Sequence, residues 1–345
     1  MDKSQQLAAL QAHLMAQHGI DAREVARLMS LSPSSVHVDR ALTNLAVMYK
    51  NRELIADTVL PVVSVKNRSD KIFAFPVTTM QELADSSLNG NRGMPKEISY
   101  SITSSDNYSV TDYALMDFVS NDEIANADAP LQPKQIATEI VTNFLMLGRE
   151  KRVADVVFGS GNYGSNTAAL AGADRWDVST SDPVQKIEDA IEACFVRPTH
   201  LVLGAQTYIK LRNHPKMLQY ILSRASTTAG DVPLRVNEQL IAEAFGLEGC
   251  VVGRAKYASN AEGATAASSY LWGKSAALIR VEPNPSPRAT QCFGYTFRFG
   301  TMETREIPDL LRGVRGGSFI KVSHSDDEVV IGGANAGYLY TTCVS

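Results

Sequence analysis

The most regular hydrophobic pattern in the chain runs from Pro133 to Phe158. Apolar residues recur there at intervals of three and four positions, which places them along one side of an α-helix. One row holds Ile136, Ile140, Phe144, Leu147, Lys151 and Ala154, with Val141, Leu145, Val153 and Val157 beside it. Pro133 suits a first helical turn, and Gly159 ends the run. We therefore predict a helix over residues 133–158, about 39 Å long at about 1.5 Å per residue.

The chain before this helix follows a different pattern, which is typical of β-strands. Residues 54–65 are apolar and rich in β-branched side chains, and a short strand is predicted over Ile72–Phe75. From Glu97 the alternation is strict, with Ile98, Tyr100 and Ile102 on one side. Residues 66–111 thus predict a long two-stranded arm with a flexible tip. Because a lone two-stranded ribbon is barely stable in water, its apolar face needs the surface of another subunit.

Two further segments before the long helix have weaker patterns. Residues 1–50 predict short helices separated by polar breaks, and helices this short are marginal unless they pack on something else. We expect them to lie on the rest of the chain or on a neighbouring subunit. Between the arm and the long helix, Tyr108–Phe118 predicts a strand and Ser120 begins a short acidic helix.

Residues 182–290 alternate between helical and extended patterns, which favours a mixed sheet flanked by helices. The predicted helices are 183–194, two short ones within 206–220, and 237–245; the predicted strands are 199–204, 250–252, 270–272 and 276–281. The tail returns to β-structure, with strands predicted at 293–299, 318–322, 327–332 and 338–344. We expect the tail to pair with strands near the long helix and to close a discontinuous domain. The glycine-rich segment 159–182 is expected to be a loop.

Composition narrows the class of protein. A chain of 345 residues, 44% apolar and 20% charged, predicts a folded protein of two or more modules. The net charge of −4 and the lack of a basic stripe argue against tight binding of nucleic acid. The four scattered cysteines predict reduced packing residues in a cytosolic compartment. No secretory signal and no apolar run of membrane-spanning length is found, so no membrane partner is expected.

Two motifs resemble catalytic or binding signatures. Gly159–Gly164 matches the glycine spacing of a dinucleotide loop, but a helix precedes it, whereas the fingerprint needs a strand before it and a helix after it. The segment His324–Glu328 could suggest metal or acid–base chemistry, but adjacent residues on a strand point to opposite faces, so we interpret it as a solvated turn. It also lacks the alternating ligand spacing of a calcium loop. We predict no catalytic, cofactor-binding or metal site and no enzyme activity. The rival hypothesis is a nucleotide-binding enzyme built on residues 160–280.

The order of the segments carries a family resemblance. The matching segments are LIADTVLPVVSV (54–65), FAFP (73–76), YSVTDYALMDFV (108–119), the helix at 133–158, SYLWGKSAALIRVEP (269–283), GYTFRFG (294–300) and AGYLYTT (336–342). In this order they resemble the major capsid protein of tailed bacteriophages, which has the Hong Kong 97 fold. The resemblance covers most of residues 40–345 and rests on loose patterns in a fixed order.

The resemblance implies an α+β fold in four parts. These are an N-terminal helical arm (1–64), a β-hairpin extension loop (65–111), a discontinuous peripheral domain with the long spine helix (112–181 and 284–345), and an α/β axial domain (182–283). In the family the extension loop lies across a neighbouring subunit, and the tips of the axial domains meet around the centres of hexamers and pentamers. About forty residues precede the matching pattern, so scaffolding is expected to come from a separate protein.

The implied function is structural. Such a protein assembles with itself, in hexamers and pentamers, into an icosahedral head that encloses double-stranded DNA through weak, non-specific contacts. It is assembled in the host cytoplasm and resides in the virion capsid. Portal, scaffolding and decoration proteins are the other expected partners. The alternative within the same fold is the shell of an encapsulin-type compartment that holds a protein cargo.

Candidate contact residues follow from the arm and the long helix. They are Phe75, Arg92, Lys96 and Tyr100 on the arm, and Glu139, Arg149, Glu150 and Arg152 on the helix. Repeated around a shell, weak ion pairs of this kind add up. Some members of the family crosslink a lysine of the extension loop to a neighbour's asparagine. Lys66, Lys71 and Lys96 are available, and nothing in the sequence singles one of them out.

Overall fold

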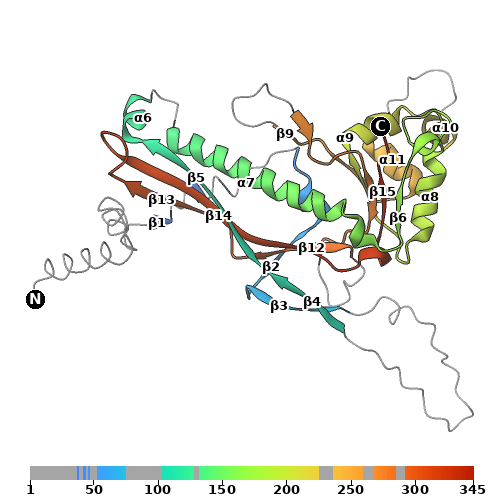
Figure 1. Ribbon diagram of the computed structural model, residues 1–345, viewed down its shortest axis with the longest axis horizontal. Coiled ribbons are helices and arrows are strands. Elements are labelled where there is room, and N and C mark those ends of the chain that lie inside the picture. Colours follow the sequence, from blue (N-terminus) through green and yellow to red (C-terminus); the bar gives the residue numbers. More distant parts are fainter. Residues whose placement is uncertain are drawn as a thin grey trace, which may run out of the picture. The chain divides into compact units, whose positions relative to one another are not determined.

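The fold is seen in a computed structural model (Figure 1). It describes residues 37–38, 42–43, 46, 53–74, 103–127, 132–224, 236–258, 268–284 and 292–345. The chain divides into two compact units. Unit 1 comprises residues 1–50, 112–145 and 301–325, and unit 2 comprises residues 51–111, 146–300 and 326–345.

The long helix α7 spans Pro133–Val157 and confirms the helix predicted from the hydrophobic pattern (Figure 1). Its residues up to Leu145 belong to unit 1 and those from Met146 to unit 2. The row that packs into the core begins with Ala137, Val141 and Leu145 and continues on the second half of the helix with Val153, Ala154 and Val157. The neighbouring row is exposed at Ile136, Ile140 and Phe144, whereas Leu147 and Ala154, further along it, pack into the core.

The described part of unit 1 is built around β-strands. β13 (Glu303–Asp309) pairs with β1 (His37–Val38) on one side and with the first part of β14 (Gly317–Val330) on the other. β5 (Thr111–Ser120) also pairs with β14. The short helix α6 (Asn121–Asn126) follows β5 directly.

Local hydrogen bonds fix the start of α6. The Ser120 hydroxyl accepts the Glu123 N–H while the Glu123 carboxylate accepts the Ser120 N–H, which is a complete capping box. The core of unit 1 contains Leu42, Val119, Ala137 and Ile320, with Ile124 packed against it.

Unit 2 contains the other strands of the tail and the base of the predicted arm. β12 (Gly294–Phe299) lies between β2 (Val62–Val65), to which it is parallel, and the last part of β14. The short helix α4 (Ala56–Val59) precedes β2. β3 (Ser69–Ala74) and β4 (Thr103–Ser109) pair antiparallel as a two-stranded ribbon. The predicted tip of the arm, and the strand predicted from Glu97, lie outside the described residues.

A second sheet in unit 2 confirms the predicted α/β stretch. Its order is β6-β15-β11-β7-β8, with β7 and β8 parallel. The strands are β6 (Thr167–Ala169), β7 (His200–Gly204), β8 (Gly249–Gly253), β11 (Ala276–Ile279) and β15 (Gly337–Thr341). β9 (Lys256–Ala258) and β10 (Ser268–Tyr270) form a separate pair.

The described helices of this part of unit 2 are α8 (Pro183–Ala193), α9 (Ala205–Arg212), α10 (Pro215–Arg224) and α11 (Glu238–Phe245). Single 3-10 turns lie at Ser160–Tyr163, Gly172–Asp174 and Gly333–Asn335.

Sequence signals at the helix ends account for these boundaries. Asp182 and Asn237 cap α8 and α11 by accepting backbone N–H groups of the first turn. Gly246 ends α11 in the left-handed conformation at φ 64°, which glycine adopts without a steric cost. α9 ends just before His214 and α10 begins at Pro215, in agreement with the two short helices predicted within 206–220.

Three features of the fold, two of them in the tail, differ from the sequence predictions. β14 runs unbroken through the segment His324–Glu328, so the prediction of a solvated turn there is wrong; His324 and Asp326 are buried. β13 was not predicted. β6 lies within the glycine-rich segment expected to be a loop, and it pairs with β15.

All four cysteines are buried free thiols: Cys194, Cys250, Cys292 and Cys343. Burial raises the pKa of the Cys194 thiol to about 11 and the pKa of the other three above the ordinary value. This confirms the prediction that they are reduced packing residues.

Candidate interaction surfaces

The charged residues in the middle of α7 are buried. The side chains of Arg149 and Glu150 are 2% and 0% exposed, and both bind groups of their own chain. The prediction that these two residues contact a neighbouring subunit does not fit this placement. The sequence shows that these two residues are charged. Periodicity alone does not show whether such residues form buried ion pairs or face solvent.

Arg149 belongs to a cluster of four charged residues in unit 2. Its Nη1 donates to Asp57 Oδ1 at 2.6 Å, and its Nε lies 3.4 Å from Asp326 Oδ2. Asp326 also accepts two hydrogen bonds from Arg298, each at 2.7 Å, in a bidentate pair. The Asp326 side chain is 0% exposed and Arg298 is 19% exposed. The cluster therefore ties α7, α4, β12 and β14 together through one buried carboxylate.

Glu150 holds the start of α4 against α7. Its Oε1 and Oε2 accept the backbone N–H groups of Ile55 and Ala56, both at 2.9 Å. Trp272 Nε1 donates to Oε1 at 2.6 Å. The Trp272 ring packs so closely on Gly253 that a Cβ there would lie 2.1 Å from it. Burial raises the pKa of the Glu150 carboxyl group, although the hydrogen bonds and Arg149 act in the opposite direction.

This raised pKa predicts a pH dependence of stability. In the folded state Glu150 binds a proton more tightly than in the unfolded state, so its contribution to stability is present at low pH and is lost as the pH rises through the folded pKa. We expect the free energy of unfolding of dissociated wild-type subunits, minus that of Glu150→Gln, to decrease as the pH rises from 4 to 7. Urea titrations at several pH values measure this difference. A difference that grows with pH would contradict the prediction.

The other predicted residues of α7 lie nearer the surface. Arg152 is 25% exposed, and its Nη2 lies 3.2 Å from Glu328 Oε1. Glu139 is exposed. The candidates Phe75, Arg92, Lys96 and Tyr100 lie outside the described residues.

An exposed apolar row runs along the first half of α7 in unit 1. Ile136, Ile140 and Phe144 are 42%, 46% and 59% exposed, and their spacing of four places them on one side of the helix. Three large apolar side chains in a line make this row a candidate contact site. Sequence periodicity found this row but did not show that it faces outward.

The loop between β13 and β14 forms a second exposed apolar surface, which sequence reasoning missed. Leu310, Leu311 and Val314 are 79%, 59% and 98% exposed. Arg315 holds the loop, because its Nη1 lies 3.2 Å from Asp122 Oδ1 and its carbonyl accepts Asn121 Nδ2 at 2.9 Å. The three side chains therefore project from an anchored turn. The sequence signal was an LL pair and a valine within a segment rich in glycine and arginine.

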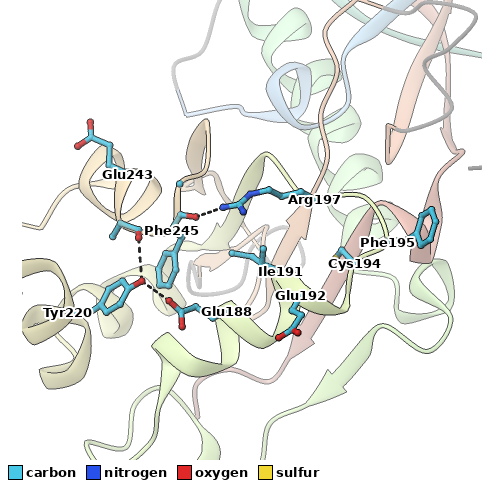
Figure 2. Close-up of a pocket in the computed structure, with 11 residues that line it drawn as sticks. Glu188, Ile191, Glu192, Cys194, Phe195, Arg197, Tyr220, Glu243 and Phe245 are labelled. Carbon is cyan, nitrogen blue, oxygen red and sulfur yellow. Dashed lines mark hydrogen bonds between the residues drawn. The ribbon is translucent and has the colours of Figure 1, made fainter. Parts of the chain in front are cut away.

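Two grooves lie in the α/β part of unit 2. The acidic groove, of about 580 Å³, is lined by Glu188, Glu192, Glu243, Arg197, Phe195, Tyr220 and neighbouring backbone (Figure 2). Tyr220 donates to Glu188 Oε1 at 2.6 Å, and Arg197 Nη2 donates to the Phe245 carbonyl at 3.0 Å. The basic groove, of about 390 Å³, is lined by Arg212, Arg254, Lys256, Glu53, Tyr208, Ile209 and Tyr270, among others.

The glycine motif at 159–164 is a packed turn after a helix. Tyr163 within it is fully buried and donates to the Val157 carbonyl at 2.6 Å. The motif thus follows a helix C-terminus, where backbone carbonyls and not N–H groups point outward, which is unsuitable for phosphate.

Within the described ranges, no cluster of His, Cys, Asp and Glu is arranged to hold a metal ion. Nor does any helix described by the structure have the length and apolar character needed to cross a bilayer.

Comparison with known proteins identifies the family to which the chain belongs. No family model matches the chain. The major capsid protein of Pseudomonas phage JBD67 is 30% identical over 319 residues, which cover 91% of this chain and 100% of that protein. The chain belongs to the phage major capsid proteins. The major capsid protein of Burkholderia phage BcepMu is also 30% identical to this capsid protein, over 276 residues that cover 76% of the chain and 83% of the relative.

Solved structures give the fold of the capsid protein. A phage-related protein from Bordetella bronchiseptica RB50 superimposes with a TM-score of 0.67 at 24% identity, over 89% of this chain and 97% of that one. The capsid of the cyanophage P-SCSP1u gives 0.55 at 10% identity, over 85% and 89% of the two chains. An encapsulin from Synechococcus elongatus PCC 7942 gives 0.50 at 9% identity, over 88% and 94%. The fold is the α+β Hong Kong 97-like fold, with a long helix packed on a mixed sheet.

The family establishes the function in general terms. The capsid protein forms the shell of the phage head and resides in the virion capsid. It is a structural protein and not an enzyme, so the hypothesis of a nucleotide-binding enzyme is wrong.

Proposed function

We propose that the capsid protein assembles through hexamers and pentamers into an icosahedral head that encloses double-stranded DNA. The observation that carries the proposal is the exposed apolar row Ile136, Ile140 and Phe144 on α7. Such a row is stable in a shell because a neighbouring copy removes it from water. Identical subunits that meet through two different surfaces form rings, and curved rings close a shell.

The extension loop supplies another part of the contact. The described base of the β3–β4 ribbon packs on its own subunit, where Ile72 and Tyr108 join a core cluster with Phe297. A two-stranded ribbon that continues beyond this support would need the surface of a partner. The loop would span residues 65–111 and lie across the next subunit, with Phe75, Arg92, Lys96 and Tyr100 as its contact residues. Glu139, which is exposed beside the apolar row, is the matching candidate on α7. The loop and the arm would shift as a compact precursor shell expands, and each step would bury more surface between subunits.

Weak contact with the packaged DNA is consistent with the net charge of −4. Many strong phosphate contacts would oppose both packaging and release, since each neutralised phosphate adds to the affinity. The portal, scaffolding and decoration proteins of a tailed phage would complete the particle. The four-part domain organisation, with axial residues 182–283, remains our proposal.

Deletion of residues 78–95, at the predicted tip of the loop, tests this proposal. We expect the wild-type protein to form closed particles and the deletion variant to stay as free subunits or small oligomers, because each subunit loses its contact with the next. Electron microscopy and analytical ultracentrifugation of the purified proteins measure the outcome. Full-sized shells from the deletion variant would contradict the role of the loop.

The content of the particles separates this function from the alternative compartment. Particles purified from the host should contain double-stranded DNA that nuclease cannot reach. An encapsulin-type compartment would instead contain a protein cargo, which mass spectrometry would identify. The two phage relatives at 30% identity favour DNA.

A further inference from the structure

The acidic and basic grooves lie at opposite ends of two parallel strands. Residues of the acidic groove come just before the strands: Phe195 and Arg197 precede β7, and Gly246 precedes β8. Residues of the basic groove come just after them: α9 follows β7, and Arg254 follows β8. Because β7 and β8 are parallel, their starts share one edge of the sheet and their ends share the other. Five residues at about 3.3 Å each separate the two edges by about 16 Å.

The two grooves are complementary in charge. The acidic groove carries the carboxylates Glu188, Glu192 and Glu243 against the single cation Arg197. The basic groove carries Arg212, Arg254 and Lys256 against the single carboxylate Glu53. One groove therefore has an excess of negative charge, and the other keeps an excess of positive charge although Arg254 is paired with Glu238.

Each groove also has an exposed apolar side chain. Phe195 in the acidic groove is 50% exposed, and Ile209 in the basic groove is 43% exposed. Such residues beside charged groups are typical of a contact that is apolar at its centre and charged at its rim.

The basic side chains are held in place by aromatic rings. Arg212 and Arg254 lie 5.7 Å and 5.8 Å from the centroid of the Tyr208 ring, and Lys256 lies 4.6 Å from that of Tyr270. Arg254 is also paired with Glu238. Cations fixed in this way lose less conformational entropy when they meet a partner.

We propose that the acidic groove of one subunit binds the basic groove of the next, so that the α/β parts of neighbouring subunits associate head to tail in a ring. This inference rests on the proposed shell function and names the surfaces that meet in it. A contact between two different surfaces relates each subunit to the next by the same rotation. The subunits close a ring when that rotation is a whole fraction of a full turn. The charges are exposed, so the contact weakens as salt rises.

Two charge-reversal variants test the pairing. Glu192→Lys with Glu243→Lys makes both grooves basic, and Arg212→Glu with Lys256→Glu makes both acidic. Each variant alone places like charges together at every contact, so we expect neither to form rings or shells. Mixed in equal amounts, they can alternate around a ring, and every contact is again between opposite charges.

Alternation gives the mixture a distinctive product. A ring of six can alternate perfectly, whereas a ring of five must place two like grooves together. We therefore expect electron microscopy of the mixture to show six-membered rings, flat sheets or tubes, but no closed icosahedral shells. The charge-preserving variants Glu192→Asp with Glu243→Asp, and Arg212→Lys with Lys256→Arg, should form normal shells.

The outcomes separate the pairing from the shell function. Normal shells from both reversal variants would overturn the pairing and leave the shell function intact, and would mean that the grooves face another partner or solvent. A mixture of folded variants that forms no six-membered rings would also overturn it. A wild-type protein that forms no particles would count against the shell function itself.

Circular dichroism and the melting temperature show whether the charge-reversal variants fold. If one of them does not fold, a neutral variant tests the pairing instead. Glu192→Gln with Glu243→Gln should raise the protein concentration needed for assembly about fivefold, since two exposed ion pairs are weakened. The shift should shrink at high salt. An unchanged threshold concentration at low salt would overturn the pairing.

Discussion

Replacing Asp326 by alanine should lower the free energy of unfolding of the subunit by about 3–5 kcal/mol. The Asp326 carboxylate is fully buried between Arg149 and Arg298, which are 2% and 19% exposed. Its removal leaves two guanidinium groups close together without the charge that compensates them. We also expect a marked loss of shells, because α7 and β14 lose their common anchor.

Chemical denaturation of dissociated subunits measures this effect. Asp155→Ala is the matched control: Asp155 lies on the exposed side of α7, 62% exposed, and pairs with Lys151 one turn away. A pair of this kind contributes at most about 0.5 kcal/mol. If the two alanine variants were equally stable, the buried cluster would not hold the fold together.

Aspartate at Ile140 and Phe144 should abolish shell assembly and leave the subunit folded. Both side chains are about half exposed on α7, so a charge there meets water in the free subunit. In the proposed contact the same charge would be buried against a neighbouring copy without a partner, which is strongly unfavourable. Ultracentrifugation should find free subunits whose melting temperature matches that of the wild type.

Val141 provides the control for this prediction. It is next to Ile140 in the sequence but is only 4% exposed. Val141→Asp should therefore unfold the subunit itself, whereas the conservative Ile140→Val should assemble normally. Shells from the Ile140→Asp, Phe144→Asp variant would show that this row is not a contact between subunits.

Local patterns predicted the helices well. The apolar spacing of α7 and of the helices predicted at 183–194 and 237–245 depends only on neighbours in the sequence, so it can be seen without the fold. Periodicity did not distinguish the buried Val141 from the exposed Ile140, because a core and a subunit contact both require apolar residues. The sequence therefore predicted the helix but did not predict which of its apolar residues stay exposed on the subunit.

Long-range pairing explains the main errors. The segment His324–Glu328 looks like a turn because it is polar, but Asp326 is buried by arginines that lie 28 and 177 positions earlier in the chain. Arg149 and Glu150 looked like surface charges for the same reason. β6 has three small residues and forms only because β15 offers it an edge. No local pattern encodes such partners.

The burial of the four thiols affects how readily the finished particle is oxidised. A phage head is built inside a reducing cell and then persists in oxygenated surroundings. With a pKa raised to about 11, the Cys194 thiol is ionised in roughly one molecule in ten thousand at pH 7, and only the thiolate reacts readily with oxidants. The other three thiols are also buried and have raised pKa values. These four thiols are therefore poorly suited to oxidation or disulfide formation after the shell has left the cell.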